Sequence, residues 1–183
     1  GKGISAALLM ASLQGLLRSQ IICGDQTVAG VMSRLNLLLR DSAGDSKYAT
    51  AFLGRYDNST RELTYVNAGH NPPVLLRAGG DVETLEEGGL ILGIMPDSAF
   101  QSGEAMLAVG DVLLLYTDGV TEGADATGEQ WGEERLIATL SASHAGSATE
   151  IGARIAGEVR TFEGDTGPAD DLTVLVVKRL PIA

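Results

Sequence analysis

The segment VLLLYTDG, residues 112–119, joins a run of apolar residues and a tyrosine to a short polar turn. An unbroken apolar run is typical of a strand buried on both faces, because a half-exposed strand would alternate. Asp118 stands where this strand ends, and Gly119 lets the backbone turn sharply beside it. The segment therefore predicts a central strand with an aspartate at its tip. Taken alone, however, Asp-Gly is simply a good turn, and a structural role is the plainer interpretation.

Further strands are expected on both sides of this segment. Turn residues and short apolar runs predict strands at 48–56, 62–67, 74–77, 82–85, 104–109 and 172–180. We expect Glu104–Val109 to pair with Val112–Tyr116 around Gly110-Asp111.

Helical patterns occupy the two ends of the chain. Ile4–Ile22 is apolar nearly all round, which predicts a helix buried on most sides. Val28–Arg40 follows helical spacing, with Asp25 or Thr27 as its N-cap. Two more helices are predicted at 133–143 and 147–162, and a Ser-x-x-Glu capping box begins the second. This order predicts an α+β fold with a largely antiparallel sheet, in one domain covering residues 1–183.

Composition narrows the classes of function. The formal net charge of −11 disfavours nucleic acid and anionic lipid as direct partners. The single cysteine excludes an internal disulfide, and no apolar run is long enough to cross a membrane. We therefore expect a cytoplasmic domain.

A second acidic segment precedes the last predicted strand. Asp170 and Asp171 stand side by side, which is unfavourable unless water or a cation neutralises their charges. By itself the pair is readily explained as a solvated strand start. Together with Asp118, however, it suggests a site for Mg²⁺ or Mn²⁺, since these hard cations prefer oxygen ligands.

The two histidines give weaker signals. His70 lies in a turn rich in Gly, Asn and Pro, where a structural role is the safer interpretation, and His144 lies in a small-residue linker. The sequence contains no Cys/His cluster that favours zinc and no serine-hydrolase elbow, and Gly1-Lys2-Gly3 lacks the spacing of a nucleotide-binding loop.

Four segments also carry a family resemblance. They are GKGISAALLM (1–10), YVNAGHNPPVLL (65–76), LLLYTDGVTEG (113–123) and ADDLTVLVV (169–177), in that order and with matching intervening segments such as LGIMPD (92–97) and WGEERL (131–136). Over essentially its whole length the chain resembles the SpoIIE/RsbU-like branch of the metal-dependent (PPM) serine/threonine protein phosphatases.

This resemblance implies a β-sandwich of mostly antiparallel sheets flanked by helices (α/β/β/α layers), with two Mn²⁺ or Mg²⁺ ions at one end. Asp118 and Asp170 would be metal ligands and would act in catalysis through a metal-bound water that attacks phosphorus. Asp171 would have a supporting role. His70 falls where the wider family has an aspartate for a third metal, so it is expected to be structural, with a general-acid role left open. Water would protonate the leaving group.

The resemblance also raises an expectation about the start of the chain. In the family, a strand and a bridging aspartate precede the glycine-lysine-glycine loop, so the sequence reads as an N-terminally truncated domain. We expect these 183 residues alone to bind metal weakly, to have little activity, and to expose sheet edges that favour aggregation or a homodimer.

The implied substrate is a phosphoserine or phosphothreonine on an anti-sigma factor antagonist of the STAS type. Relatives also imply an upstream sensor or receiver domain that acts through the helices at 4–22 and 28–40. Two alternatives remain: a catalytically inactive module that uses the phosphatase fold for binding, and a phosphoesterase that acts on a small molecule.

Overall fold

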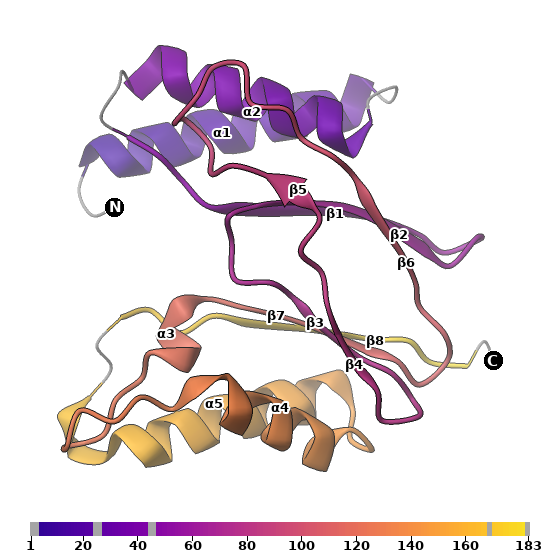
Figure 1. Cartoon of the computed structure of the whole chain (residues 1–183), viewed down its shortest axis with the longest axis vertical. Coiled ribbons are helices and arrows are strands. Elements are labelled where there is room, and N and C mark those ends of the chain that lie inside the picture. The colour runs from indigo at the N-terminus through magenta and orange to yellow at the C-terminus, as the bar shows by residue number, and fades with distance from the viewer. Residues whose placement is uncertain (1–3, 24–26, 44–46, 168–169, 182–183) are drawn as a thin grey trace. The chain divides into compact units, whose positions relative to one another are not determined.

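Two sheets, each with its own helices, are present in the computed structural model (Figure 1). The structure describes all residues except 1–3, 24–26, 44–46, 168–169 and 182–183, so the Gly1-Lys2-Gly3 loop and the Asp25 cap lie outside the described residues. The chain divides into two compact units. Unit 1 is Gly1–His70 with Glu86–Met106, and unit 2 is Asn71–Leu85 with Leu107–Ala183. That residues 1–183 form one domain stays a prediction.

The sheet of unit 1 is built around β2. Its strands are β1 (Ala51–Asp57), β2 (Glu62–Ala68), β5 (Gly88–Gly89) and β6 (Gly103–Met106). β2 pairs antiparallel with β1 and β6 and parallel with β5. The β1–β2 turn forms because the Asp57 carboxylate accepts hydrogen bonds from both the N–H and the hydroxyl of Ser59.

Helix α2 (Val28–Ala43) packs its apolar face on this sheet. The Thr27 hydroxyl accepts a hydrogen bond from Gly30 N–H at 3.0 Å, so Thr27 acts as a cap at the start of the helix. The buried positions follow the expected helical spacing, and they are Val28, Val31, Met32, Leu35 and Leu39. Together with β2 residues such as Val66 they form the core of unit 1.

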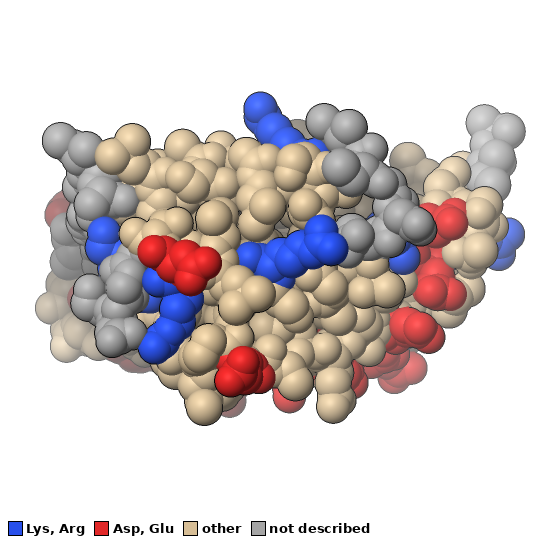
Figure 2. Space-filling model, turned by 90° about the horizontal axis from the view of Figure 1, so that it is seen from above, with Lys and Arg blue, Asp and Glu red and all other residues tan. Residues whose placement is uncertain are grey.

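Helix α1 (Ile4–Cys23) is less buried than its sequence predicts. It packs on α2, and Leu9, Leu13, Leu16 and Leu17 reach the core only in part. Leu8 and Met10 are 66% and 55% exposed, so the prediction of a helix buried on most sides is wrong for this structure. Figure 2 looks down on the α1 and α2 side and shows a largely uncharged surface with scattered Lys, Arg, Asp and Glu side chains. The reason is that α1 packs chiefly against α2 and contacts the core of unit 1 only through one row of leucines.

Unit 2 contains an antiparallel sheet in the order β4-β3-β7-β8. The strands are β3 (Val74–Leu76), β4 (Val82–Thr84), β7 (Val112–Tyr116) and β8 (Val174–Lys178). The helices are α3 (Asp118–Thr121), α4 (Gly132–Ser143) and α5 (Ala148–Glu163), followed by the 3₁₀ turn η2 (Gly164–Thr166). The predicted capping box at Ser147 and Glu150 is confirmed. Apolar residues of α4, α5, β3 and β7 share one buried core.

One predicted pairing is wrong. β6 pairs with β2, whereas β7 pairs with β3 and β8, so the segments on either side of Gly110-Asp111 belong to different sheets. The turn is fixed instead by the buried Asp111 carboxylate, which accepts hydrogen bonds from Ala108 N–H, Ala78 N–H and Arg77. These hydrogen bonds connect the turn to the residues that follow β3, and β6 pairs with β2 in the other sheet.

The predicted α+β class with mostly antiparallel sheets is confirmed. Within the described residues, no helix is long and apolar enough to span a membrane.

Candidate metal centre

The end of β7 and the start of β8 lie side by side in unit 2 (Figure 1). The strands are antiparallel, and Tyr116 is paired with Val174 in the last register position of the ladder. One residue further, Thr117 N–H donates to the carbonyl oxygen of Thr173 at 3.1 Å. This geometry carries Asp118, the first residue of α3, toward the segment that contains Asp170.

Gly119 shows how closely the two acidic segments approach. A Cβ on Gly119 would lie 2.7 Å from the carbonyl oxygen of Asp171 and 3.5 Å from the carbonyl carbon of Asp170. A real Cβ does not tolerate the shorter contact, so glycine is required for this approach. The structure thus brings together the two segments that the sequence analysis singled out.

Asp118 and Asp170 are both exposed, and each carboxylate is oriented by a hydrogen bond from the next residue in the chain. Oδ1 of Asp118 accepts a hydrogen bond from Gly119 N–H at 2.9 Å, and Oδ1 of Asp170 accepts one from Asp171 N–H at 2.8 Å. Among the described residues, neither carboxylate forms an ion pair with Lys or Arg. Two acidic residues on neighbouring backbone segments, with no Lys or Arg ion pair among the described residues, offer oxygen ligands of the kind that hard divalent cations prefer.

This donor set is only part of a coordination sphere. In the described part of the chain, no three His, Cys, Asp or Glu side chains gather as a complete metal-binding cluster. Two carboxylates fit Mg²⁺ or Mn²⁺ as part of an oxygen shell, since such ions commonly keep several waters.

His70 belongs to unit 1, where it follows β2. The buried Asn67 side chain holds its backbone in a turn, because Asn67 donates to the His70 carbonyl and accepts from His70 N–H. The His70 ring nitrogen Nδ1 lies 3.4 Å from the Thr50 hydroxyl. These contacts agree with the structural role expected for His70.

The second histidine ends helix α4. The carbonyl oxygen of His144 accepts a hydrogen bond from Lys178 Nζ at 2.6 Å, which places it at a helix end rather than near Asp118.

Tyr116 adjoins the acidic site, but its hydroxyl is unsuited to act as an acid or a base at neutral pH. Burial, and then the nearby Glu133 carboxylate, raises the pKa of Tyr116 to about 12. The hydroxyl therefore stays protonated at neutral pH and donates to Glu133 at 3.3 Å.

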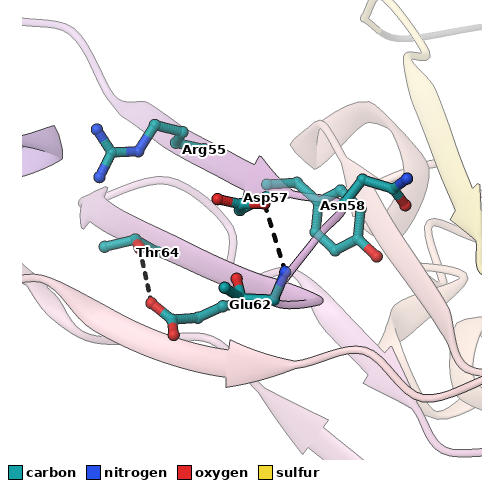
Figure 3. Close-up of a pocket in the computed structure, with 7 residues that line it drawn as sticks. Arg55, Asp57, Asn58, Glu62 and Thr64 are labelled. Atoms are coloured by element: carbon teal, nitrogen blue, oxygen red, sulfur yellow. Dashed lines mark hydrogen bonds between the residues drawn. The ribbon is translucent and has the colours of Figure 1, made fainter.

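The β1–β2 hairpin of unit 1 also carries a surface hollow of about 390 Å³ (Figure 3). Its lining is polar and mostly exposed, and consists of Arg55, Tyr56, Asp57, Asn58, Thr60, Glu62 and Thr64. Hydrogen bonds from Ser59, and then from Thr60, hold the pKa of Asp57 below its ordinary value, so this lining group is ionised at neutral pH. The hollow contains none of the predicted site residues.

Sequence reasoning missed two contributors to the acidic site. Sequence pattern indicates no role for Thr117 and only a turn for Gly119. The contacts of both run to residues more than fifty positions away, such as the bond from Thr117 Oγ1 to the Asp171 carbonyl. The sequence carries no signal for these contacts until β7 and β8 are known to be neighbours, because both contacts are made to the segment that precedes β8.

Comparison with known proteins agrees with the expected family. The model of the family described as Stage II sporulation protein E (SpoIIE) matches residues 1–180. The phosphoserine phosphatase RsbU of Bacillus subtilis is 30% identical over 182 residues, which cover 98% of this chain and 53% of RsbU. The chain spans between about a third and about half the length of the curated relatives it matches.

Solved structures share the fold. The SiaA-PP2C domain of Pseudomonas aeruginosa matches with a TM-score of 0.84 at 21% identity, covering 97% of this chain and 72% of that one. The phosphatase domain of SpoIIE from Bacillus subtilis, presoaked with Mn, matches with a TM-score of 0.64 at 19% identity, covering 96% and 74%. The predicted fold class is thereby confirmed.

Proposed function

Because this chain belongs to the SpoIIE family and has the fold of PP2C-type phosphatase domains, we propose that it hydrolyses a phosphoserine or phosphothreonine ester on a regulatory protein. The observation that carries this proposal is the meeting of the Asp118 and Asp170 segments at the paired ends of β7 and β8. The relative RsbU is itself named a phosphoserine phosphatase.

In this proposal, Asp118 and Asp170 hold Mn²⁺ or Mg²⁺, two ions in the intact domain, through their carboxylate oxygens. When bound, the metal lowers the pKa of water and neutralises charge on the phosphoryl oxygens. The carboxylates themselves carry no covalent intermediate. Their task is to fix the position of the cation against two rigid strand ends, since a misplaced centre loses the geometry needed for attack on phosphorus.

The proposed substrate is a phosphorylated anti-sigma factor antagonist, with an upstream sensor or receiver domain as regulator. The similarity to RsbU, which extends over both units, supports this choice of substrate and regulator. The exposed apolar face of α1 supports a partner at that helix, either a homodimer or a regulatory segment. A cytoplasmic location belongs to the same proposal.

A catalytically inactive binding module is the competing function. It is favoured by the incomplete metal cluster in the described residues. It is opposed by the close approach of the two acidic segments, to which the described residues contribute no Lys or Arg ion pair. Without a metal this approach is unfavourable, because like charges repel.

Hydrolysis assays distinguish these functions. We would measure phosphate release with Mn²⁺ from a phosphoserine peptide and from ATP, using the longest natural chain that contains these residues. We expect release from the peptide, and a loss of at least about 100-fold for Asp118→Asn and Asp170→Asn, because ligand loss removes most metal-dependent rate enhancement. Asp81→Asn, on an exposed turn of unit 2, is the matched control. Release from ATP alone would favour a small-molecule phosphoesterase, and no release would favour the binding module.

A further inference from the structure

The hydroxyl group of Thr117 joins the two acidic segments. Its Oγ1 donates to the carbonyl oxygen of Asp171 at 3.0 Å and accepts from Thr173 N–H, also at 3.0 Å. The backbone N–H of Thr117 donates to Thr173 as well. One residue thus makes three hydrogen bonds to the segment that leads into β8.

These hydrogen bonds continue the contact between the two segments beyond the end of the β7–β8 ladder. The β7–β8 pairing ends at Tyr116 and Val174, and beyond it the chain of β7 turns into α3. Thr173 N–H therefore pairs with a side-chain hydroxyl. Only a group that donates and accepts at once can satisfy both Thr173 N–H and the Asp171 carbonyl, which serine or threonine does and valine does not.

Gly119 completes the contact on the other side of Asp118. Its missing Cβ leaves room for the Asp171 carbonyl, which is the same oxygen that Thr117 holds. Asp118 therefore lies between two residues that both contact Asp171, one through a hydrogen bond and one through close packing.

We infer that Thr117 is a positioning residue that sets the spacing between the Asp118 and Asp170 carboxylates. This inference rests on the proposed function, since the spacing matters because of a shared divalent cation. Thr117 acts through the backbone of Asp171, the residue next to Asp170, and touches neither substrate nor cation in this account. Residues that orient metal ligands typically change metal affinity by about 10–100-fold when they are replaced.

Three variants test the inference in the longest natural chain that contains these residues. Thr117→Val keeps the shape and removes the hydroxyl, whereas Thr117→Ser keeps the hydroxyl and removes a methyl group. The control is Thr161→Val on α5, whose hydroxyl donates to the Gly157 carbonyl within the same helix. Metal-free protein is examined by amide hydrogen exchange at Thr173, and metal binding by calorimetry with Mn²⁺ and Ca²⁺.

We expect faster exchange at Thr173 in Thr117→Val and Mn²⁺ affinity lowered by about tenfold, with Ca²⁺ affinity lowered less, because Ca²⁺ tolerates irregular geometry better. Thr117→Ser and Thr161→Val should bind as the parent protein does. A change in the Mn²⁺/Ca²⁺ affinity ratio marks positioning, since mere loss of stability would lower both affinities together.

Two outcomes overturn the inference, and they differ. If exchange at Thr173 rises while Mn²⁺ affinity stays unchanged, the hydroxyl is structural only and the proposed function stands. If the parent protein binds no Mn²⁺ while the exchange effect persists, the proposed function itself fails, and the positioning role fails with it.

Discussion

The position of a Cβ on Gly119 lies 2.7 Å from the carbonyl oxygen of Asp171, a residue fifty-two positions later in the chain. No side chain fits in this gap, because the neighbouring atom is a backbone oxygen, which cannot rotate away as the end of a side chain can. The backbone at the start of α3 and that of the segment before β8 are therefore in direct contact beside Asp118.

Gly119→Ala should therefore damage the proposed metal site more than the fold. We expect a loss of stability of about 1–3 kcal/mol from overpacking, and Mn²⁺ affinity lowered by at least about tenfold. Gly157→Ala is the control, since a Cβ there meets nothing within 4 Å and should stabilise α5 by about 0.5–1 kcal/mol. Urea unfolding and Mn²⁺ calorimetry measure the two effects. Unchanged Mn²⁺ affinity in Gly119→Ala would show that the contact does not shape the site.

Asn36→Ala should destabilise unit 1. Asn36 is buried on α2, where its side chain accepts from Gly93 N–H at 2.7 Å and donates to the Met95 carbonyl at 2.8 Å. Removing the Asn36 side chain leaves Gly93 N–H and the Met95 carbonyl without this partner, which should lower the free energy of unfolding by about 2–4 kcal/mol in total. Chemical denaturation measures the loss. Asn58→Ala, in the exposed β1–β2 turn, should change stability by less than about 0.5 kcal/mol. Equal effects of the two variants would refute the role given to Asn36.

Asp111 should make the free energy of unfolding fall as the pH is lowered into the acid range. Burial alone would raise the pKa of Asp111, but hydrogen bonds from Ala78 N–H, Arg77 and Ala108 N–H outweigh it and hold the pKa below its ordinary value. Because the folded pKa is depressed, the carboxylate contributes stability above its unfolded pKa of about 3.8, and this contribution is lost as pH falls through the folded pKa.

Asp111→Asn tests that contribution. We expect the variant to be less stable than the parent at pH 7 by about 1–3 kcal/mol, and the difference to shrink as pH falls below about 4. Thermal unfolding measured between pH 3 and pH 7 gives the comparison, with Asp81→Asn as the exposed control. A constant difference between parent and Asp111→Asn over this pH range would contradict the account.

The sequence predicted most of what depends on local pattern. The apolar run of β7 is buried as expected, with Val112 and Leu114 fully covered, and α5 begins at its capping box. These features follow from short-range periodicity and from a side chain that bonds three residues away, so they can be recognised without knowing the rest of the chain.

Features that depend on distant partners were missed. The Gly110-Asp111 turn looks like a hairpin, but the carboxylate of Asp111 bonds to Ala78, and the two flanking strands join different sheets. The two-residue strand β5 is too short for any periodicity. Leu8 is exposed because α1 packs mainly on α2 and reaches the core through other leucines, which apolar content alone does not reveal.

The acidic site was predictable in part for the same reason. Asp118 and Asp170 were identified because each stands at the end of an apolar strand, and antiparallel pairing of β7 with β8 brings those ends together. The contacts that fix their spacing come from Thr117 and Gly119, and these arise from the pairing itself.

A double-mutant cycle of Mn²⁺ affinity on Asp118→Asn and Asp170→Asn tests the central claim most directly. If both carboxylates hold one cation, each single variant should lower the Mn²⁺ affinity by at least about tenfold. The double variant should then bind Mn²⁺ little more weakly than the weaker-binding single variant, which corresponds to a coupling free energy of about 1 kcal/mol or more. Losses that multiply in the double variant, or Mn²⁺ affinity unchanged in either single variant, would show that the two strand ends do not share a metal.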